Sequence, residues 1–187
     1  MVFIVSVILW VVLGTVALIV LYVIVVFNSL IMLKNRVENA WSQIDVQLKR
    51  RYDLIPNLIN TVKGYMKHEK GTLTELTKMR SQLISGPMSQ KAKASDAVSN
   101  ALKSLFAVAE NYPKLQASEN FKMLQEELSG TESKIAYARQ FYNDNVMSLN
   151  NKIQQFPSSI IANMLKFPQK EFFKADQGER KAVKVEF

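Results

Sequence analysis

The stretch from Asn35 to Lys70, NRVENAWSQIDVQLKRRYDLIPNLINTVKGYMKHEK, decides the fold of this chain. Apolar residues recur in it at steps of three and four, which is the spacing of a helix with one buried face. These residues are Val37, Trp41, Ile44, Leu48, Tyr52, Ile55, Ile59, Val62 and Met66. The sequence therefore predicts a long amphipathic helix that packs against other helices.

Pro56 lies in the middle of this predicted helix. Proline has no backbone amide to donate, and its ring collides with the carbonyl of the residue four places earlier, here Tyr52. We therefore expect a kink between Tyr52 and Pro56. The carbonyl that loses its partner needs another donor, and our hypothesis is that Arg139 or Asn143, from a facing helix, supplies it.

An apolar run precedes this stretch and predicts a membrane anchor. Between Val2 and Phe27 the phenol of Tyr22 is the sole ionisable group, and the run includes Trp10 and Gly14. About 20 apolar residues suffice to cross a bilayer. A secretory signal peptide has a shorter apolar core of about 7 to 15 residues, with basic residues before it. The run has neither feature, so we expect a single retained transmembrane helix.

Charge and the lack of a turn signal after the run predict how the anchor joins the domain. Lys34 and Arg36 follow the span, and basic residues beside a span favour the cytoplasmic side. The expected topology places the N-terminus outside and the domain in the cytoplasm, at the inner (plasma) membrane of the cell. Between Leu30 and Met66 the apolar stripe continues, so the span is predicted to continue as the first helix of the domain.

Three further helical segments follow in the sequence. Residues 72–75 fit a capping box for a helix that ends near Ser85, before Gly86 and Pro87. A second segment covers 94–108, and a third keeps a near-heptad spacing over 121–156 until Pro157. The pattern favours an all-α fold in which the transmembrane helix is continuous with an up-and-down antiparallel bundle of about four long helices. The expected division is an anchor at 1–33, a bundle domain at 34–157 and a tail at 158–187.

The tail is apolar enough to predict a short helix and a contact surface. Phe172 and Phe173 are candidates for this contact. In the final residues Val183, Val185 and Phe187 alternate as in a short strand. The sequence leaves open whether the tail packs on its own bundle, on a neighbouring copy or on the membrane.

Composition and motifs predict no catalytic, cofactor or metal site. The 187 residues include no cysteine, which excludes disulfides, thiolate metal sites and cysteine nucleophiles. The sequence also lacks a glycine-rich phosphate loop, a nucleophile elbow and a zinc-protease motif. The single histidine lies among charged residues without a second ligand at helical spacing. We therefore expect a protein that is not an enzyme and needs no cofactor.

The net charge of +8 favours acidic partners without choosing among them. The basic triplet Lys49, Arg50 and Arg51 is 15 residues beyond Lys34, or about 22 Å along an upright helix, which is too far for strong lipid attraction. Aromatic residues do not alternate with these charges, which disfavours nucleic acid. The triplet is predicted to form a charged face for contact with protein.

Several blocks of the sequence resemble one known family. These are the opening stretch, YPKLQASENFKMLQEEL at 112–128, ARQFYND at 138–144, and IQQFPSSIIANML at 153–165 with the nearby EFF. Together they resemble the LemA family of bacterial single-pass membrane proteins. The resemblance implies an N-terminal anchor, a bundle of about four long helices, and no known enzymatic activity or cofactor. Gly71 and the segment 164–166 depart from the common pattern of that family.

Two functions remain open at this level. The first is a non-enzymatic, membrane-anchored scaffold that forms homo-oligomers side by side and organises or shapes the membrane. The alternative is an adaptor or regulatory partner of another membrane protein, such as a membrane protease, which the gene neighbours of the family also imply. Restriction to a membrane raises the effective concentration for either contact.

Overall fold

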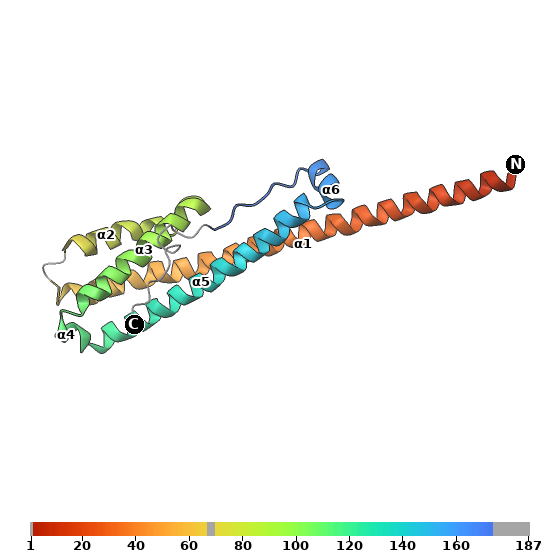
Figure 1. Ribbon diagram of the computed structural model, residues 1–187. Helices are drawn as coiled ribbons and strands as arrows, with labels where there is room; N and C mark the ends of the chain where they lie inside the picture. Colours follow the sequence, from red (N-terminus) through yellow and green to blue (C-terminus); the bar gives the residue numbers. More distant parts are fainter. Residues whose placement is uncertain (1, 67–69, 174–187) are drawn as a thin grey trace, which may run out of the picture. The chain divides into compact units, whose positions relative to one another are not determined.

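The computed structural model describes residues 2–66 and 70–173 (Figure 1). Within these ranges the chain is all-α, as predicted, and contains no strand. The helices are α1 (Val2–Lys63), α2 (Lys70–Gln82), α3 (Met88–Ala109), α4 (Pro113–Gln116), α5 (Glu119–Gln154) and α6 (Ser158–Met164). The predicted terminal strand with Val183, Val185 and Phe187 lies outside the described residues.

The chain forms two compact units. One, the anchor unit, combines Met1–Asn39 with Asn143–Phe172. The other, the bundle unit, combines Ala40–Tyr142 with the segment that begins at Phe173. Helices α1 and α5 contribute residues to both units. The boundaries at 33 and 157 that the sequence suggested for anchor, bundle and tail stay a prediction.

The apolar stripe of the opening stretch forms one wall of the core, as its spacing predicts. All of its members are buried except Trp41 and Tyr52, which are half-buried. In the bundle unit, buried residues of α2, α3 and α5 complete this core, among them Leu76, Leu105 and Ile135. The helix remains continuous through Pro56, so the predicted continuity of α1 from the apolar run to Lys63 is confirmed.

Glycine and proline set the limits of the helices close to where the sequence places them. Gly86, at a φ of 89°, adopts a left-handed conformation that other residues rarely tolerate, and α3 begins two residues later. Pro113 begins the short α4. Proline suits the first position of a helix because no intrahelical acceptor awaits its missing amide. Helix α5 ends just before Pro157.

In the anchor unit, α1 is exposed from Phe3 to Val25 and becomes buried at Val26 and Leu30. The first part is apolar and long enough to cross a membrane. The chain after α6 returns along α5, where the side chain of Asn150 pairs with the backbone of Lys170. Its Nδ2 donates to the carbonyl of Lys170 and its Oδ1 accepts from the amide of Lys170, both at 2.9 Å.

Candidate functional site

Arg51 is fully buried in the bundle unit although its neighbours Lys49 and Arg50 are exposed. Helix α1 presents it to α3, where Nη1 donates to the carbonyl of Ser95 at 3.0 Å and to the hydroxyl of Ser99 at 3.1 Å. Its Nη2 forms an ion pair with Glu132 of α5. Burial lowers the pKa of Arg51 below its usual value. A guanidinium remains protonated in proteins, so the charge persists and needs these partners.

A second arginine extends this network. Arg139 of α5 pairs with Asp96 at 2.6 Å and donates to the hydroxyl of Ser95 at 2.8 Å. Ser95 therefore accepts hydrogen bonds from both arginines: Arg51 donates to its carbonyl and its hydroxyl, and Arg139 donates to its hydroxyl. The guanidinium of Arg139 also lies over the ring of Phe173, 4.4 Å from its centroid. We call the set Arg51, Arg139, Asp96, Glu132, Ser95 and Ser99 the charge cluster.

The charge cluster joins three helices through groups that are balanced in charge. Two guanidiniums face two carboxylates, and serine hydroxyls take up further donors and acceptors. Such a network fixes which residues of neighbouring helices face each other, because any shift along an axis would leave a buried charge without its partner. Among the described residues, no group of three or more His, Cys, Asp or Glu side chains is placed to hold a metal ion.

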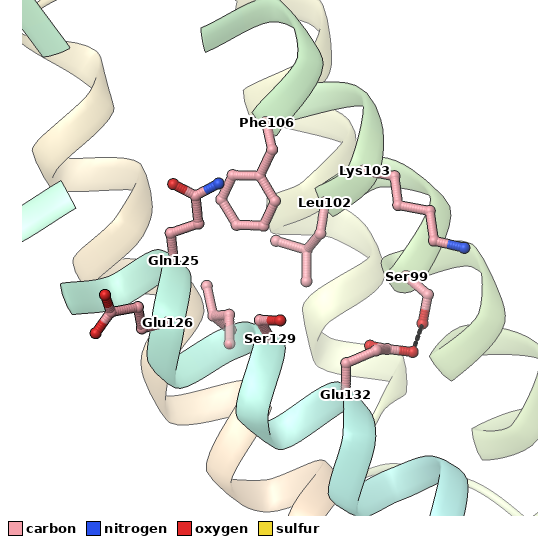
Figure 2. A pocket seen from close by; sticks show the side chains of 9 residues that line it. Ser99, Leu102, Lys103, Phe106, Gln125, Glu126, Ser129 and Glu132 are labelled. Atoms are coloured by element: carbon pink, nitrogen blue, oxygen red, sulfur yellow. Dashed lines mark hydrogen bonds between the residues drawn. The ribbon is translucent and has the colours of Figure 1, made fainter. Parts of the chain in front are cut away.

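A groove of about 530 Å³ lies beside the charge cluster, between α3 and α5. Figure 2 shows Leu102, Phe106 and Lys103 on the α3 side, and Gln125, Glu126 and Glu132 on the α5 side. The buried residues Leu102 and Leu128 and the half-buried Phe106 give it an apolar floor. Charged and amide groups at its rim would meet the polar side of a bound helix or peptide.

An exposed apolar patch lies on another part of the bundle unit, over α1 and α5. Val46 of α1 is 63% exposed, and Tyr137 and Phe141 of α5 are 74% and 48% exposed. These residues line one shallow pocket together with Gln43, Gln47, Lys134 and Ala138. Large apolar side chains gathered at one surface mark a contact surface more often than scattered ones do. We call Val46, Tyr137 and Phe141 the apolar patch.

The three basic residues 49–51, predicted to form one contact face, have different environments in the structure. Lys49 pairs with Asp53 at 2.6 Å, and Arg50 pairs with Glu127. The prediction is wrong for Arg51, which is inside the bundle. Its position shows why: Arg51 lies three residues after Leu48 and four before Ile55, so it belongs to the buried stripe. Helical spacing alone could have assigned this arginine to the core.

The donor to the carbonyl at the proline is Arg80, which the sequence prediction did not name. Its Nε donates to the carbonyl of Tyr52 at 2.8 Å, and its guanidinium lies 3.7 Å from the centroid of the Tyr52 ring. The hypothesis named Arg139 or Asn143 for this role. It is wrong for Arg139, which pairs with Asp96 and Ser95 instead. Arg80 is on α2, and no signal in the sequence shows which turn of α2 faces Pro56.

The two tail phenylalanines have different environments. Phe173 is 5% exposed and packs in the bundle unit against Trp41, with ring centroids 6.3 Å apart, as well as against Arg139. Phe172 is 47% exposed. Part of the tail therefore packs on its own chain, while the contact predicted for Val183, Val185 and Phe187 lies outside the described residues.

The anchor residues that the sequence singled out lie on the exposed part of α1. Trp10, Gly14, Tyr22 and Phe27 are all exposed, and the side chain of Val2 is outside the described set. Apolar side chains that remain exposed over so long a helix are suited to contact with lipid. This arrangement supports the prediction of a membrane anchor.

Comparisons with known proteins agree with the blocks of resemblance. The sequence profile of the LemA family matches residues 40–187. Protein LemA of Metamycoplasma hominis is 30% identical over 159 residues, which cover 82% of this chain and 71% of that protein. Magnetosome protein MamQ 2 of Paramagnetospirillum magneticum is 23% identical over 174 residues. MamQ of Magnetospirillum gryphiswaldense is 22% identical over the same number. The matched region spans 64% of the length of these two magnetosome proteins.

Proposed function

This chain belongs to the LemA family, and we propose that it is a non-enzymatic scaffold that associates side by side with its own copies at the membrane. The protein is membrane-associated, and among residues 2–66 and 70–173 one helix is long and apolar enough to cross a bilayer. In this role, lateral contacts between the bundle units of neighbouring copies organise or shape that membrane. The magnetosome proteins among the relatives support a role at a cellular membrane system.

The observation that carries this proposal is the apolar patch of Val46, Tyr137 and Phe141. Burial of such side chains against a second copy would remove apolar surface from water at about 25 cal/mol per Å². In a two-fold contact the same surface of each copy meets the other, so these three apolar side chains would pack against their counterparts. Anchoring restricts the encounter to two dimensions, which lets a modest contact support assembly.

The test measures the mass of the full-length chain purified in mild detergent, by mass photometry, and compares it with two variants. Val46→Ser combined with Tyr137→Ser removes the two most exposed side chains of the patch, and we expect the particles of this double variant to be several-fold smaller than those of the unchanged chain. Met123→Ser is the matched control, because Met123 is 60% exposed on α5 but does not line the patch. The proposal would be contradicted if the chain without substitutions were a monomer by itself. It would also be contradicted if the double variant formed particles of the same mass as that chain.

We also propose that the N-terminus is outside and the bundle unit is in the cytoplasm. Because the chain has no cysteine, a single cysteine introduced at the exposed Ser104 reports the side directly. A membrane-impermeant maleimide should label Ser104→Cys in broken cells and not in intact spheroplasts. Equal labelling in intact spheroplasts would reverse the assigned topology.

The groove between α3 and α5 favours a second candidate function, an adaptor for another membrane protein such as a protease. Its apolar floor and charged rim suit an amphipathic helix of a partner. A photoreactive amino acid at the exposed Gln125, which lines the groove, should then crosslink a different protein, whereas one at the exposed Lys122 should not. A monomer in detergent that enlarges only after addition of that partner would favour the adaptor over the scaffold.

A further inference from the structure

We propose that the turn after α5 and the helix α6 insert apolar side chains into the headgroup layer of the bilayer beside the anchor. The side chains are Phe156, Ile160, Met164 and Leu165, which we call the interfacial cap. Phe156 and Met164 are 81% and 77% exposed, and Ile160 and Leu165 are about half exposed, at 54% and 47%. This contact goes beyond the proposed scaffold function, since it concerns lipid and a different unit of the chain.

One side of α6 is buried, while the other exposes Ile160 and Met164 beside the polar Asn163. Ile161 and Ala162 pack inside the anchor unit. Ile160 and Met164 are four residues apart and therefore lie on one face of the helix. A water-exposed helix would normally carry polar residues on that face. Exposed apolar side chains on the outer face of a packed helix are unfavourable in water, so we expect them to contact another apolar surface.

The position of the interfacial cap along the membrane span follows from the residue at which α1 becomes buried. Val26 is 1% exposed, whereas Ile24 and Val25 before it are half exposed or more. In the anchor unit the other segment is Asn143–Phe172, so this segment covers Val26. Val26 lies inside the charge-free run that ends at Phe27. The covering segment therefore reaches the last turn of the membrane span.

Helix length places this last turn in the headgroup layer. The run from Val2 to Phe27 extends to about 39 Å at about 1.5 Å per residue, whereas the hydrocarbon core is about 30 Å thick. The chain reverses direction between α5 and Lys170, which pairs with Asn150 of α5, so the turn after α5 and helix α6 form one end of the covering segment. Figure 1 shows α6 at the end of α5, next to the part of α1 that leads into the span.

Lys166 provides an independent observation. It follows the C-cap of α6 with a φ of 53°, a left-handed conformation that favours glycine and costs other residues about 1 kcal/mol or more. A lysine at this position is exposed and directly follows Met164 and Leu165. An ammonium next to inserted apolar side chains would meet the phosphates of the headgroup layer. A cation at a position that would suit glycine better therefore supports the bilayer surface as the occupant.

The experiment uses the full-length chain with one cysteine labelled by the fluorophore NBD, reconstituted into vesicles of phosphatidylcholine and phosphatidylglycerol. Met164→Cys reports on the cap. Met147→Cys is the matched control, because Met147 is an exposed methionine of the same unit, nine residues before Phe156 and so about 14 Å away along the helix. Quenching is measured with lipids that carry a spin label either near the headgroup or deep in the acyl chain.

We expect blue-shifted emission at position 164 and several-fold stronger quenching by the shallow label than at position 147. The deep label should quench position 164 less than the shallow label does. Equal, water-like emission at both positions would overturn the proposal. Blue-shifted emission without lipid quenching would also overturn it, since a second protein copy would then cover the cap.

A substitution of Lys166 tests the role of charge. Asparagine tolerates the left-handed conformation, so Lys166→Asn should preserve the fold while it removes the ammonium. In the Lys166→Asn chain, quenching of the fluorophore at position 164 by the shallow spin label should no longer increase when phosphatidylglycerol is added to phosphatidylcholine. The chain with Lys166 should show that increase. An identical response of both chains to anionic lipid would refute the assigned role of Lys166.

Discussion

The Nε of Arg80 donates to the backbone carbonyl of Tyr52 at 2.8 Å, where the absent amide of Pro56 would otherwise have donated. The same guanidinium stacks on the Tyr52 ring. Helix α2 is thus attached to α1 at the one turn whose hydrogen-bond ladder is interrupted by proline. The carbonyl that proline leaves without an intrahelical donor is therefore the acceptor through which a second helix binds.

Arg80→Met should destabilise the bundle unit by about 1 to 3 kcal/mol, because it removes a charged donor and a cation–π contact. In a Pro56→Ala background the restored amide satisfies the carbonyl, so the cost of Arg80→Met should fall by about 1 kcal/mol. Thermal unfolding of the four chains in one detergent, followed by circular dichroism, measures both effects. Lys78→Met on the exposed face of α2 is the control. Equal costs in the two backgrounds would rule out a link between Arg80 and the proline.

Glu132→Gln should leave the buried charge of Arg51 without its carboxylate partner. Because Glu132 itself is 39% exposed, we expect a loss of about 1 to 3 kcal/mol, below the range for a fully buried pair. Combining it with Arg51→Met should restore part of this loss, since no buried charge then remains at position 51. Glu126→Gln, an exposed glutamate of the same helix, should change the unfolding midpoint little. A double variant less stable than Glu132→Gln would contradict this account.

Phe173→Ala should destabilise the protein by about 3 kcal/mol, because it opens a cavity between Trp41 and Arg139. Phe172→Ala changes the preceding residue, which is exposed, and should cost less than about 0.5 kcal/mol. Tryptophan emission of the full-length chain gives a second readout, since Trp41 should shift to the red only in Phe173→Ala. Similar effects of the two substitutions would show that Phe173 does not anchor the tail.

Asn150→Ala should release the return chain after α6, because it removes both hydrogen bonds to Lys170. At about 1 kcal/mol each, their loss should speed hydrogen exchange of the Lys170 amide by roughly tenfold or more. Asn151→Ala changes an exposed asparagine next in the chain and should leave that exchange rate unchanged. Mass spectrometry of exchanged peptides over 165–173 compares the two. Unaltered exchange in Asn150→Ala would mean that other contacts hold this segment.

Much of the fold could be predicted because its signals are local. The apolar run of α1, the stripe from Val37 to Met66 and the breaks at Gly86 and Pro157 each depend on residues within a few turns of one another. The candidate contact surfaces could not be predicted in this way. Tyr137 and Phe141 lie off the buried spacing of Ile135, Ala138 and Tyr142, but only the packed bundle places Val46 of α1 beside them.

The sequence by itself determined that this chain has one apolar span, continuous with a helix of the bundle, and that its helices are amphipathic. Tertiary structure alone decided that Arg51 pairs with Glu132, that Arg80 donates to the carbonyl of Tyr52, and that Ile160 and Met164 of α6 are exposed while Ile161 and Ala162 are buried. The physical reason is that periodicity fixes which side of a helix is buried, whereas the partner of a buried group depends on the rotation and register of a distant helix.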